Sequence, residues 1–416
     1  VKTELFKSMH ATERKSYGTI YYPISFFILT FLLWDNYKVI LITSILILAI
    51  ADAMAAIIGS NVRHPRRYTF GGESKSIQGS ATMLVTSFII TFTCLNSLSF
   101  IDTIHVSVLH SLWIAFVTAV IASACESVSY KGSDNVTVPL GAAFTMHFML
   151  TNGAGNIGFT IGIILALFIA TISYRLKFLS GGGAVGTFLL GVIVFGIGGW
   201  KFSLPILTFF VLSSVLSKLG KKRKQKLSEK FQKSSQRDLW QVMANGGIAG
   251  FAVLIWNYYP GEFWYYLFVA SVAAANSDTW GTEIGVFSKM KPRNILNFTS
   301  VPVGSSGGIT PLGTFGAMLG SLVIALTGAI YINGAFVVFI IFIAGFGGSI
   351  IDSIIGATVQ AQYRCPHCHK ITEKEIHCSV YKTELISGWR WIDNDIVNGL
   401  CTLSGGLFAW IWLSFF

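Results

Sequence analysis

Long apolar runs recur along almost the whole of this chain, and they constrain its fold more than any other feature of the sequence. An α-helix needs about 20 apolar residues to cross the hydrocarbon core of a bilayer. Only helices and closed barrels satisfy their backbone hydrogen bonds at that depth. About thirteen runs approach the required length, and several are short enough to form re-entrant or broken helices. The predicted spans are 16–34, 39–59, 79–95, 104–126, 136–152, 158–174, 179–198, 202–219, 241–256, 263–278, 312–332, 334–359 and 396–416.

The composition agrees with an all-α polytopic integral membrane protein. Charged residues make up only 12% of the chain, whereas a soluble domain carries about a quarter. The abundance of Gly suits closely packed membrane helices. The sequence has no basic surface interleaved with aromatic residues, so nucleic acid is not an expected partner. The chain begins with Val1 rather than Met, from which we expect an N-terminal piece to be missing.

Basic residues are distributed very unevenly between the two sides of the predicted membrane. Of the 30 Lys and Arg residues, only Lys38 and Lys201 fall in the short loops on one side. The positive-inside rule therefore places the large loops in the cytoplasm. We expect a multi-pass protein of a bacterial inner membrane, with its active face cytoplasmic. The run Lys221–Lys224 is expected to be a solvated loop on that face, with binding of anionic membrane lipid or attraction of a nucleotide as the alternatives.

A Gly/Asn-rich stretch at 151–156 divides the chain into two predicted modules, 1–152 and 158–416. Each module has a carboxylate followed by small residues, and then a Lys with a Gly/Ser-rich stretch that opens a helix. The paired segments are Asp52–Gly59 with Asp278–Gly285, and Ser74–Ser80 with Lys289 and 304–308. Two explanations stay open, which are an ancient duplication and chance similarity between Gly-rich membrane sequences.

The first module combines a carboxylate in an apolar run with a Gly/Ser turn. Asp52 would be costly at membrane depth unless it were functional or paired with a basic residue. A Gly/Ser turn at a helix N-terminus offers free backbone N–H groups to a phosphate, although such turns also simply cap helices. Mg²⁺ between Asp52 and nucleotide phosphates would balance the charge, because Mg²⁺ prefers hard oxygen ligands. The predicted site residues are Asp52, Lys75, Glu126, Asp134 and Asn135 as catalytic, with Ser76, Gly79 and Ser80 as phosphate-binding.

The second module has carboxylates, cations and a Gly/Ser nest in the order that phosphoryl transfer requires. Asp278 and Thr282 are four residues apart and therefore share a helix face. The segment 304–308 is the strongest candidate for a phosphate cradle, and Gln360 is a candidate polar lining residue. The predicted catalytic residues are Asp278, Glu283, Asp352 and Asp395, with Asp278 as the Mg²⁺ ligand. The predicted nucleotide-binding and phosphate-binding residues are Asn245, Asn276, Thr282, Lys289, Gly304, Ser305, Ser306, Gly307, Gly308, Asn394 and Asn398.

A Cys/His cluster lies in the last large loop. A C-x-x-C pair and a following His-Cys pair can supply the four ligands of a tetrahedral Zn²⁺ site. The predicted ligands are Cys365, Cys368, His377 and Cys378, with His367 or His369 as substitutes. The alternative is a cytosolic loop with reduced thiols. We therefore expect a small structural zinc knuckle.

Two known families share these motifs. The first module, through Asp52–Ala56, Lys75–Ser80 and Glu126–Pro139, resembles the phytol and dolichol kinases, which are relatives of the membrane cytidylyltransferases. The second module resembles the plant phytyl-phosphate kinase family, catalogued as domain of unknown function ninety-two. The segments that carry this second likeness are Gln241–Gly247, Asn276–Glu283, Val301–Gly308, Asp352–Ser353 and Asn394–Asn398. The first module departs from its family because it lacks the basic N-terminal segment and leading helices.

The resemblance implies an enzyme that phosphorylates an isoprenoid alcohol such as phytol, and then converts the isoprenyl monophosphate to the diphosphate. It also implies CTP as the phosphoryl donor, together with Mg²⁺. The alternative function is a multi-pass transporter of a lipid or small anionic solute, which would carry its polar residues at broken helices near the midplane. The predicted polar residues gather toward one face instead, which favours the kinase.

Overall fold

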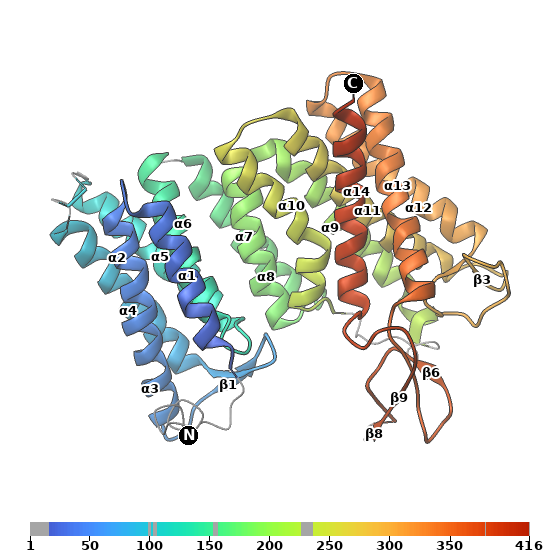
Figure 1. The fold of residues 1–416 in the computed structure, drawn as a ribbon, viewed down its shortest axis with the longest axis horizontal. Helices are drawn as coiled ribbons and strands as arrows, with labels where there is room; N and C mark the ends of the chain where they lie inside the picture. Colours follow the sequence, from blue (N-terminus) through green and yellow to red (C-terminus); the bar gives the residue numbers. More distant parts are fainter. Residues whose placement is uncertain are drawn as a thin grey trace, which may run out of the picture. The chain divides into compact units, whose positions relative to one another are not determined.

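The computed structural model describes residues 16–98, 101–102, 106–152, 157–225, 236–378 and 380–415. Thirteen continuous helices run through these residues, and each corresponds to one predicted span (Figure 1). Nine of the helices in the described part are long and apolar enough to cross a membrane, and two more are shorter apolar helices. The prediction of an all-α polytopic membrane protein is thereby confirmed. The chain forms two compact units, unit 1 (Val1–Thr160) and unit 2 (Ile161–Phe416), and the predicted linker residues 153–156 lie outside the described residues.

The described residues of unit 1 form a bundle of five helices with one short hairpin. Its second helix passes through a π-helical turn, η3, immediately before the residues that pack against α4. The elements are α1 (Gly18–Leu33), α2 (Lys38–Leu46), η3 (Ile47–Asp52), α3 (Ala53–Asn61), β1 (Arg67–Thr69), β2 (Ser74–Ser76), α4 (Ile77–Ser97), α5 (Val108–Ser127) and α6 (Asp134–Thr151). The last helix, α6, packs against α5, α2 and α1 and so closes the bundle.

In unit 2 the part of the chain that the structure describes has eight helices, with several two- or three-stranded pieces of sheet in the loops. Its helices are α7 (Ile157–Arg175), α8 (Gly181–Gly191) continued by η4 (Val192–Ile197), α9 (Gly199–Gln225), α10 (Leu239–Tyr258), α11 (Glu262–Gly285), α12 (Pro311–Gly328) continued by η5 (Ala329–Tyr331), α13 (Ala335–Thr358) and α14 (Asn394–Leu413). The strands are β3 (Arg293–Asn294), β4 (Gly308–Ile309), β5 (Gln362–Arg364), β6 (Ile371–Thr372), β7 (Ile376–His377), β8 (Tyr381–Lys382) and β9 (Glu384–Ser387).

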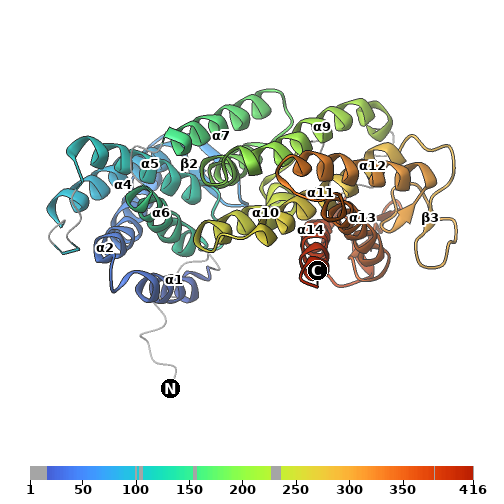
Figure 2. The same ribbon diagram turned by 90° about the horizontal axis from the view of Figure 1, so that it is seen from above.

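Helix α11 is the centre of unit 2. It packs against α9, α10, α12, α13 and α14, and Figure 2 shows it among its neighbours. Every residue from Tyr265 to Ser277 is buried, so this helix presents almost no surface to lipid. A helix shielded by protein can carry polar side chains that a lipid-facing helix could not. Burial therefore explains how α11 can hold two carboxylates near its C-terminus.

The helices of unit 1 recur in the same order in α10–α14 of unit 2. In each set a helix with a carboxylate leads to an antiparallel strand pair and then to a capped helix. The pairs are β1–β2 before α4 and β3–β4 before α12. A fourth helix then carries an acid near its C-terminus, and a fifth begins with Asp and Asn residues. The first and fifth helices of each set are also in contact, as α1 with α6 and α10 with α14.

The close contacts within the two sets also correspond residue by residue. A Cβ added at Gly79 would meet Ala55 O at 3.0 Å, Ser76 Oγ at 3.0 Å and Gly59 Cα at 3.5 Å. A Cβ added at Gly313 would meet the three matching atoms, Gly281 O at 2.9 Å, Thr310 Oγ1 at 3.0 Å and Gly285 Cα at 3.3 Å.

In both sets the two contacted residues on the carboxylate's helix follow the carboxylate by three and seven positions. Ala55 and Gly59 follow Asp52, and Gly281 and Gly285 follow Asp278. The shared geometry favours duplication over chance. It also corrects the predicted pairing, because Ser74–Ser80 matches 308–314 rather than Lys289 with 304–308.

Candidate active site

A cavity of about 520 Å³ opens where α11 ends in unit 2. The ends of α9, α11 and α13, the starts of α10, α12 and α14, and the 303–310 loop all contribute to its lining. Most of the predicted residues of the second module lie on it. They are Asn245, Asp278, Thr282, Glu283, Gly304, Ser305, Ser306, Gly307, Gly308, Asp352, Gln360, Asn394 and Asn398. Segments more than a hundred residues apart in sequence therefore meet at one polar cavity.

Three carboxylates approach one another on this cavity. Asp352 is within electrostatic range of both Asp278 and Glu373, and one of its oxygens, Oδ2, is buried without a hydrogen-bond partner. Like charges held together in a partly dry site repel each other unless a cation or shared proton compensates. Oxygen ligands of this kind suit Mg²⁺. Asp278, Asp352 and Glu373 are therefore a donor set that fits a divalent cation.

The Gly/Ser loop faces these carboxylates. Gly304 has φ +81° and Gly307 has φ +71°, a left-handed conformation that Gly adopts without strain. Gly307 also packs so closely on Ala357 that an added Cβ would stand 2.5 Å from that side chain. The next helix, α12, begins at Pro311 with Thr310 as its N-cap. Turns of this kind beside a helix N-terminus direct backbone N–H groups toward an anion.

Glu373 reaches the cavity from the Cys/His loop and was missed by sequence reasoning. Its Oε1 accepts hydrogen bonds from Ser306 Oγ at 2.7 Å and Gln360 Nε2 at 3.1 Å. These bonds connect the Cys/His loop to the Gly/Ser loop. No local pattern distinguishes Glu373 from the other acidic residues of that loop, so only the tertiary contact identifies it.

Three predicted residues of the second module are not part of the cavity lining. Asn276 is fully buried in a helix interface, where it accepts a hydrogen bond from Ser213 Oγ at 2.8 Å and donates one to Gly320 O at 2.7 Å. Lys289 is exposed in the loop after α11. Asp395 lies in the first turn of α14, and the N-cap of this helix is Asp393, whose side chain accepts the Asp395 N–H. Asn394 and Asn398, which are four residues apart, face the cavity instead.

The predicted residues of the first module converge around Lys75. Its Nζ lies 2.7 Å from Glu126 Oε1 and 3.5 Å from Asp134 Oδ2, and it donates a hydrogen bond of 2.7 Å to Ser129 Oγ. Ser80 Oγ donates to the other oxygen of Glu126 at 3.3 Å. The hairpin β1–β2, the end of α5 and the start of α6 thus supply one charged group. Lys75, predicted to be catalytic, is ion-paired to both carboxylates in this structure.

Ser76 and Asn135 are the chain neighbours of Lys75 and Asp134, and Asp52 lies in η3, which packs against α4. Ser76 is the N-cap of α4, and its Oγ accepts the Gly79 N–H at 3.1 Å. The Asn135 side chain donates to Gly132 O and Asp134 Oδ1. Asp52 ends the π-helix η3, one turn before Ala55, whose carbonyl oxygen packs on Gly79. A π-helical turn at a carboxylate is a feature often found at functional sites.

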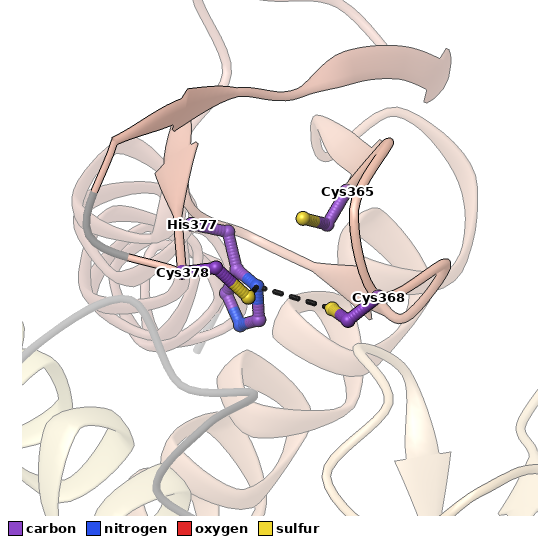
Figure 3. A group of neighbouring side chains, drawn as sticks. All are labelled: Cys365, Cys368, His377 and Cys378. Carbon is purple, nitrogen blue, oxygen red and sulfur yellow. Dashed lines mark hydrogen bonds between the residues drawn. The ribbon is translucent and has the colours of Figure 1, made fainter.

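Four potential metal ligands meet in the Cys/His loop (Figure 3). They are Cys365, Cys368, His377 and Cys378, which is the predicted set, and their ligand atoms all lie within 4.8 Å of one another. A tetrahedral site with Zn–S bonds of about 2.3 Å needs sulfur atoms about 3.8 Å apart, so a small contraction would complete it. His367, the first of the two predicted substitutes, instead stacks on Tyr381.

The backbone of the Cys/His loop favours the thiolate form of Cys365. Burial raises the pKa of the Cys365 thiol, but hydrogen bonds from the Cys368 and His367 backbone lower it to about 6 overall. Cys378 has φ +48°. This left-handed turn lets neighbouring ligands His377 and Cys378 approach one point, with Cys378 Sγ 3.2 Å from His377 Nδ1. The donor set and its geometry fit Zn²⁺.

Comparisons with known proteins agree with the motifs. Protein PGR of Arabidopsis thaliana is 32% identical over 262 residues, covering 57% of this chain and 89% of that protein. An uncharacterized membrane protein of Methanocaldococcus jannaschii is 31% identical over 200 residues, or 47% of this chain and 81% of the relative. The phytol kinase of Synechocystis is 35% identical over 141 residues, which cover 33% of this chain and 57% of that enzyme. No solved structure matches the chain.

The family comparison covers more than half of the chain. The model described as integral membrane protein DUF92 matches residues 164–406, which include every lining residue of the 520 Å³ cavity. The resemblance seen in the motifs is thereby confirmed. The chain is a multi-pass membrane protein that belongs to the DUF92 family.

Proposed function

We propose that this protein is a nucleotide-dependent kinase of isoprenoid lipids. The observation that carries the proposal is the convergence of Asp278, Asp352 and Glu373 with the 304–308 loop on one cavity. Carboxylates for a metal ion facing a Gly/Ser nest are the parts that phosphoryl transfer needs. A phytol kinase among the relatives supports the same class of substrate.

The two units divide the work in this proposal. Unit 1 phosphorylates an alcohol such as phytol, and unit 2 converts the monophosphate to the diphosphate. In each reaction the bond between the β-phosphate oxygen and the γ-phosphorus of CTP breaks, and a new bond forms from the acceptor oxygen to that phosphorus. The alcohol must also lose its proton, and the Glu126 carboxylate is a base held in place by Lys75 and Ser80.

The chain's own residues would provide positioning and charge. Asp52 in unit 1 and Asp278, Asp352 and Glu373 in unit 2 would hold Mg²⁺, which when bound neutralises the charge of the nucleotide phosphates. The Gly/Ser loops would hold the phosphates through backbone N–H groups. Zn²⁺ on the four Cys/His ligands would stiffen the loop that carries Glu373. The loops that line the cavity would face the cytoplasm of a bacterial cell.

The proposal is tested with the purified full chain in lipid nanodiscs. It is given phytol or phytyl monophosphate with each of four γ-labelled nucleoside triphosphates, and labelled lipid products are separated. We expect Mg²⁺-dependent transfer of label to both lipids, with CTP preferred. Absence of transfer from every nucleotide, together with uptake of an anionic solute by proteoliposomes, would instead establish the transporter alternative.

A further inference from the structure

Two cavities of unit 2 meet along one face of α10. The 520 Å³ polar cavity is lined in part by Arg237, Gln241 and Asn245, and the same three residues border a second cavity. The rest of the second cavity is almost entirely apolar, with side chains of α7, α8, η4 and α9. Gln241 and Asn245 are four residues apart on one face of α10, and Arg237 directly precedes Asp238, the N-cap of this helix. They form the junction between a polar space and an apolar one.

Arg237 is the one basic residue among the described residues that line the polar cavity. Its backbone is held on both sides, since its N–H donates to Phe178 O and its C=O accepts from the Ser180 N–H, each at 2.9 Å. Its guanidinium carbon stands 5.4 Å from the centre of the Phe209 ring. Burial lowers the pKa of the Arg237 guanidinium, and the nearby carboxylate of Glu283 opposes this shift, so the side chain keeps the positive charge that arginine carries in proteins. A cationic side chain is therefore fixed at the junction.

A lipid substrate that already carries a phosphate needs a cationic side chain, such as Arg237, to bind that phosphate. The carboxylates Asp278, Asp352 and Glu373 suit a metal ion and its nucleotide, but they would repel the phosphate of a second substrate. Arginine presents a planar fork of N–H donors that matches phosphate oxygens. A molecule with a phosphate head and an apolar chain would place its head at Arg237 and its chain beyond the junction.

We propose that Arg237 binds the phosphate of an isoprenyl monophosphate, and that the apolar cavity between α7, α8, η4, α9 and α10 holds the part of the isoprenyl chain next to it. This assignment rests on the proposed function of unit 2 and specifies where its lipid substrate lies. It also explains why unit 2 would prefer the monophosphate to the alcohol, because the alcohol has no phosphate for the guanidinium to bind. The remainder of a long chain continues from this cavity into the bilayer.

The head-group test replaces Arg237 by Gln and by Lys in the full chain. A lost charge-assisted bidentate contact should raise KM for phytyl monophosphate roughly 10- to 100-fold, with a smaller rise for Arg237→Lys. KM for the nucleotide and the melting temperature should stay unchanged. Arg175→Gln is the matched control, because Arg175 is exposed at the end of α7 and does not line either cavity.

The chain test fills the apolar cavity. Leu207 of α9 lines it, whereas Val211 of the same helix is 53% exposed. Leu207→Trp should raise KM for phytyl monophosphate at least 10-fold relative to dimethylallyl monophosphate, whose chain is short. Val211→Trp should change neither value.

Binding of phytyl monophosphate is also measured without nucleotide, so that this inference and the proposed function can fail separately. Turnover by the unmodified protein with unchanged KM values in Arg237→Gln and Leu207→Trp would overturn the inference and leave the kinase intact. Binding that weakens in both variants, without any turnover, would support the subsite and overturn the kinase. Failure of the unmodified protein to bind phytyl monophosphate would overturn the inference.

Discussion

Replacing Asp278 by Asn should abolish phosphorylation of the isoprenyl monophosphate and leave phosphorylation of the alcohol almost unchanged. Asn keeps the shape of Asp but loses the negative charge. Asp278 lies in the polar cavity with Asp352 and Glu373, so the variant leaves two of three carboxylates for the metal ion. The monophosphate should therefore accumulate when the alcohol is supplied.

The size of the loss follows from the charge that is removed. A preorganised electrostatic contact in the transition state is worth about 2.7 to 4 kcal/mol. Because each 1.36 kcal/mol changes a rate about tenfold, kcat should fall roughly 100- to 1000-fold. The cavity is only partly closed from solvent, so we expect the lower end of this range.

Asp52→Asn is the matched variant in unit 1, at the position that corresponds to Asp278 in the internal repeat. It should stop phosphorylation of the alcohol, whereas supplied monophosphate should still be converted to diphosphate. The assay is product analysis with each lipid in turn. Loss of both reactions in both variants would show that the two units form one composite site. No effect of Asp52→Asn would show that the first module is inactive.

Three further predictions concern packing, metal and topology. Gly320→Ala should lower the melting temperature, because the added Cβ would stand 2.8 Å from a backbone oxygen of α11. Gly247→Ala is the control and should leave the melting temperature unchanged, because no atom lies within 4 Å of its Cβ position. Equal melting temperatures of the two variants would contradict this packing. Metal analysis should find about one zinc per chain. Chelation of the zinc should slow phosphorylation of the monophosphate more than phosphorylation of the alcohol, because the zinc stabilises the loop that carries Glu373. A zinc-free protein of normal activity would disprove this. Cysteines introduced at Arg293 and Lys374 should react with an impermeant reagent from the same side of the membrane, and labelling from opposite sides would refute the topology.

The positions of the helices were readable from the sequence because the bilayer imposes a local requirement. A span is recognised by its length and apolarity alone, and no tertiary contact is needed to find it. The cluster of four Cys and His side chains was predictable for a similar reason. They lie within fourteen residues of chain, from Cys365 to Cys378, so local turns can bring them together.

Which residues line the cavity could not be predicted from the sequence in this way. Asn276 and Asp278 are two residues apart, which corresponds to about 200° around a helix, so only one of them faces the cavity. Arg237 and Glu373 reach the cavity through contacts between distant loops. Their neighbours in sequence give no sign of this, because surface loops contain many residues of both kinds.

The sequence by itself determined a polytopic helical protein, two sets of helices with similar order and the polar residue types that gather in the candidate sites, since these depend on local hydropathy and spacing. The tertiary structure decided which polar side chains share a cavity and which are used in helix packing. It also decided that Gly79 and Gly313 occupy matching places, because their backbone contacts agree atom by atom. Such contacts depend on how helices pack against one another, which spacing along a single helix does not specify.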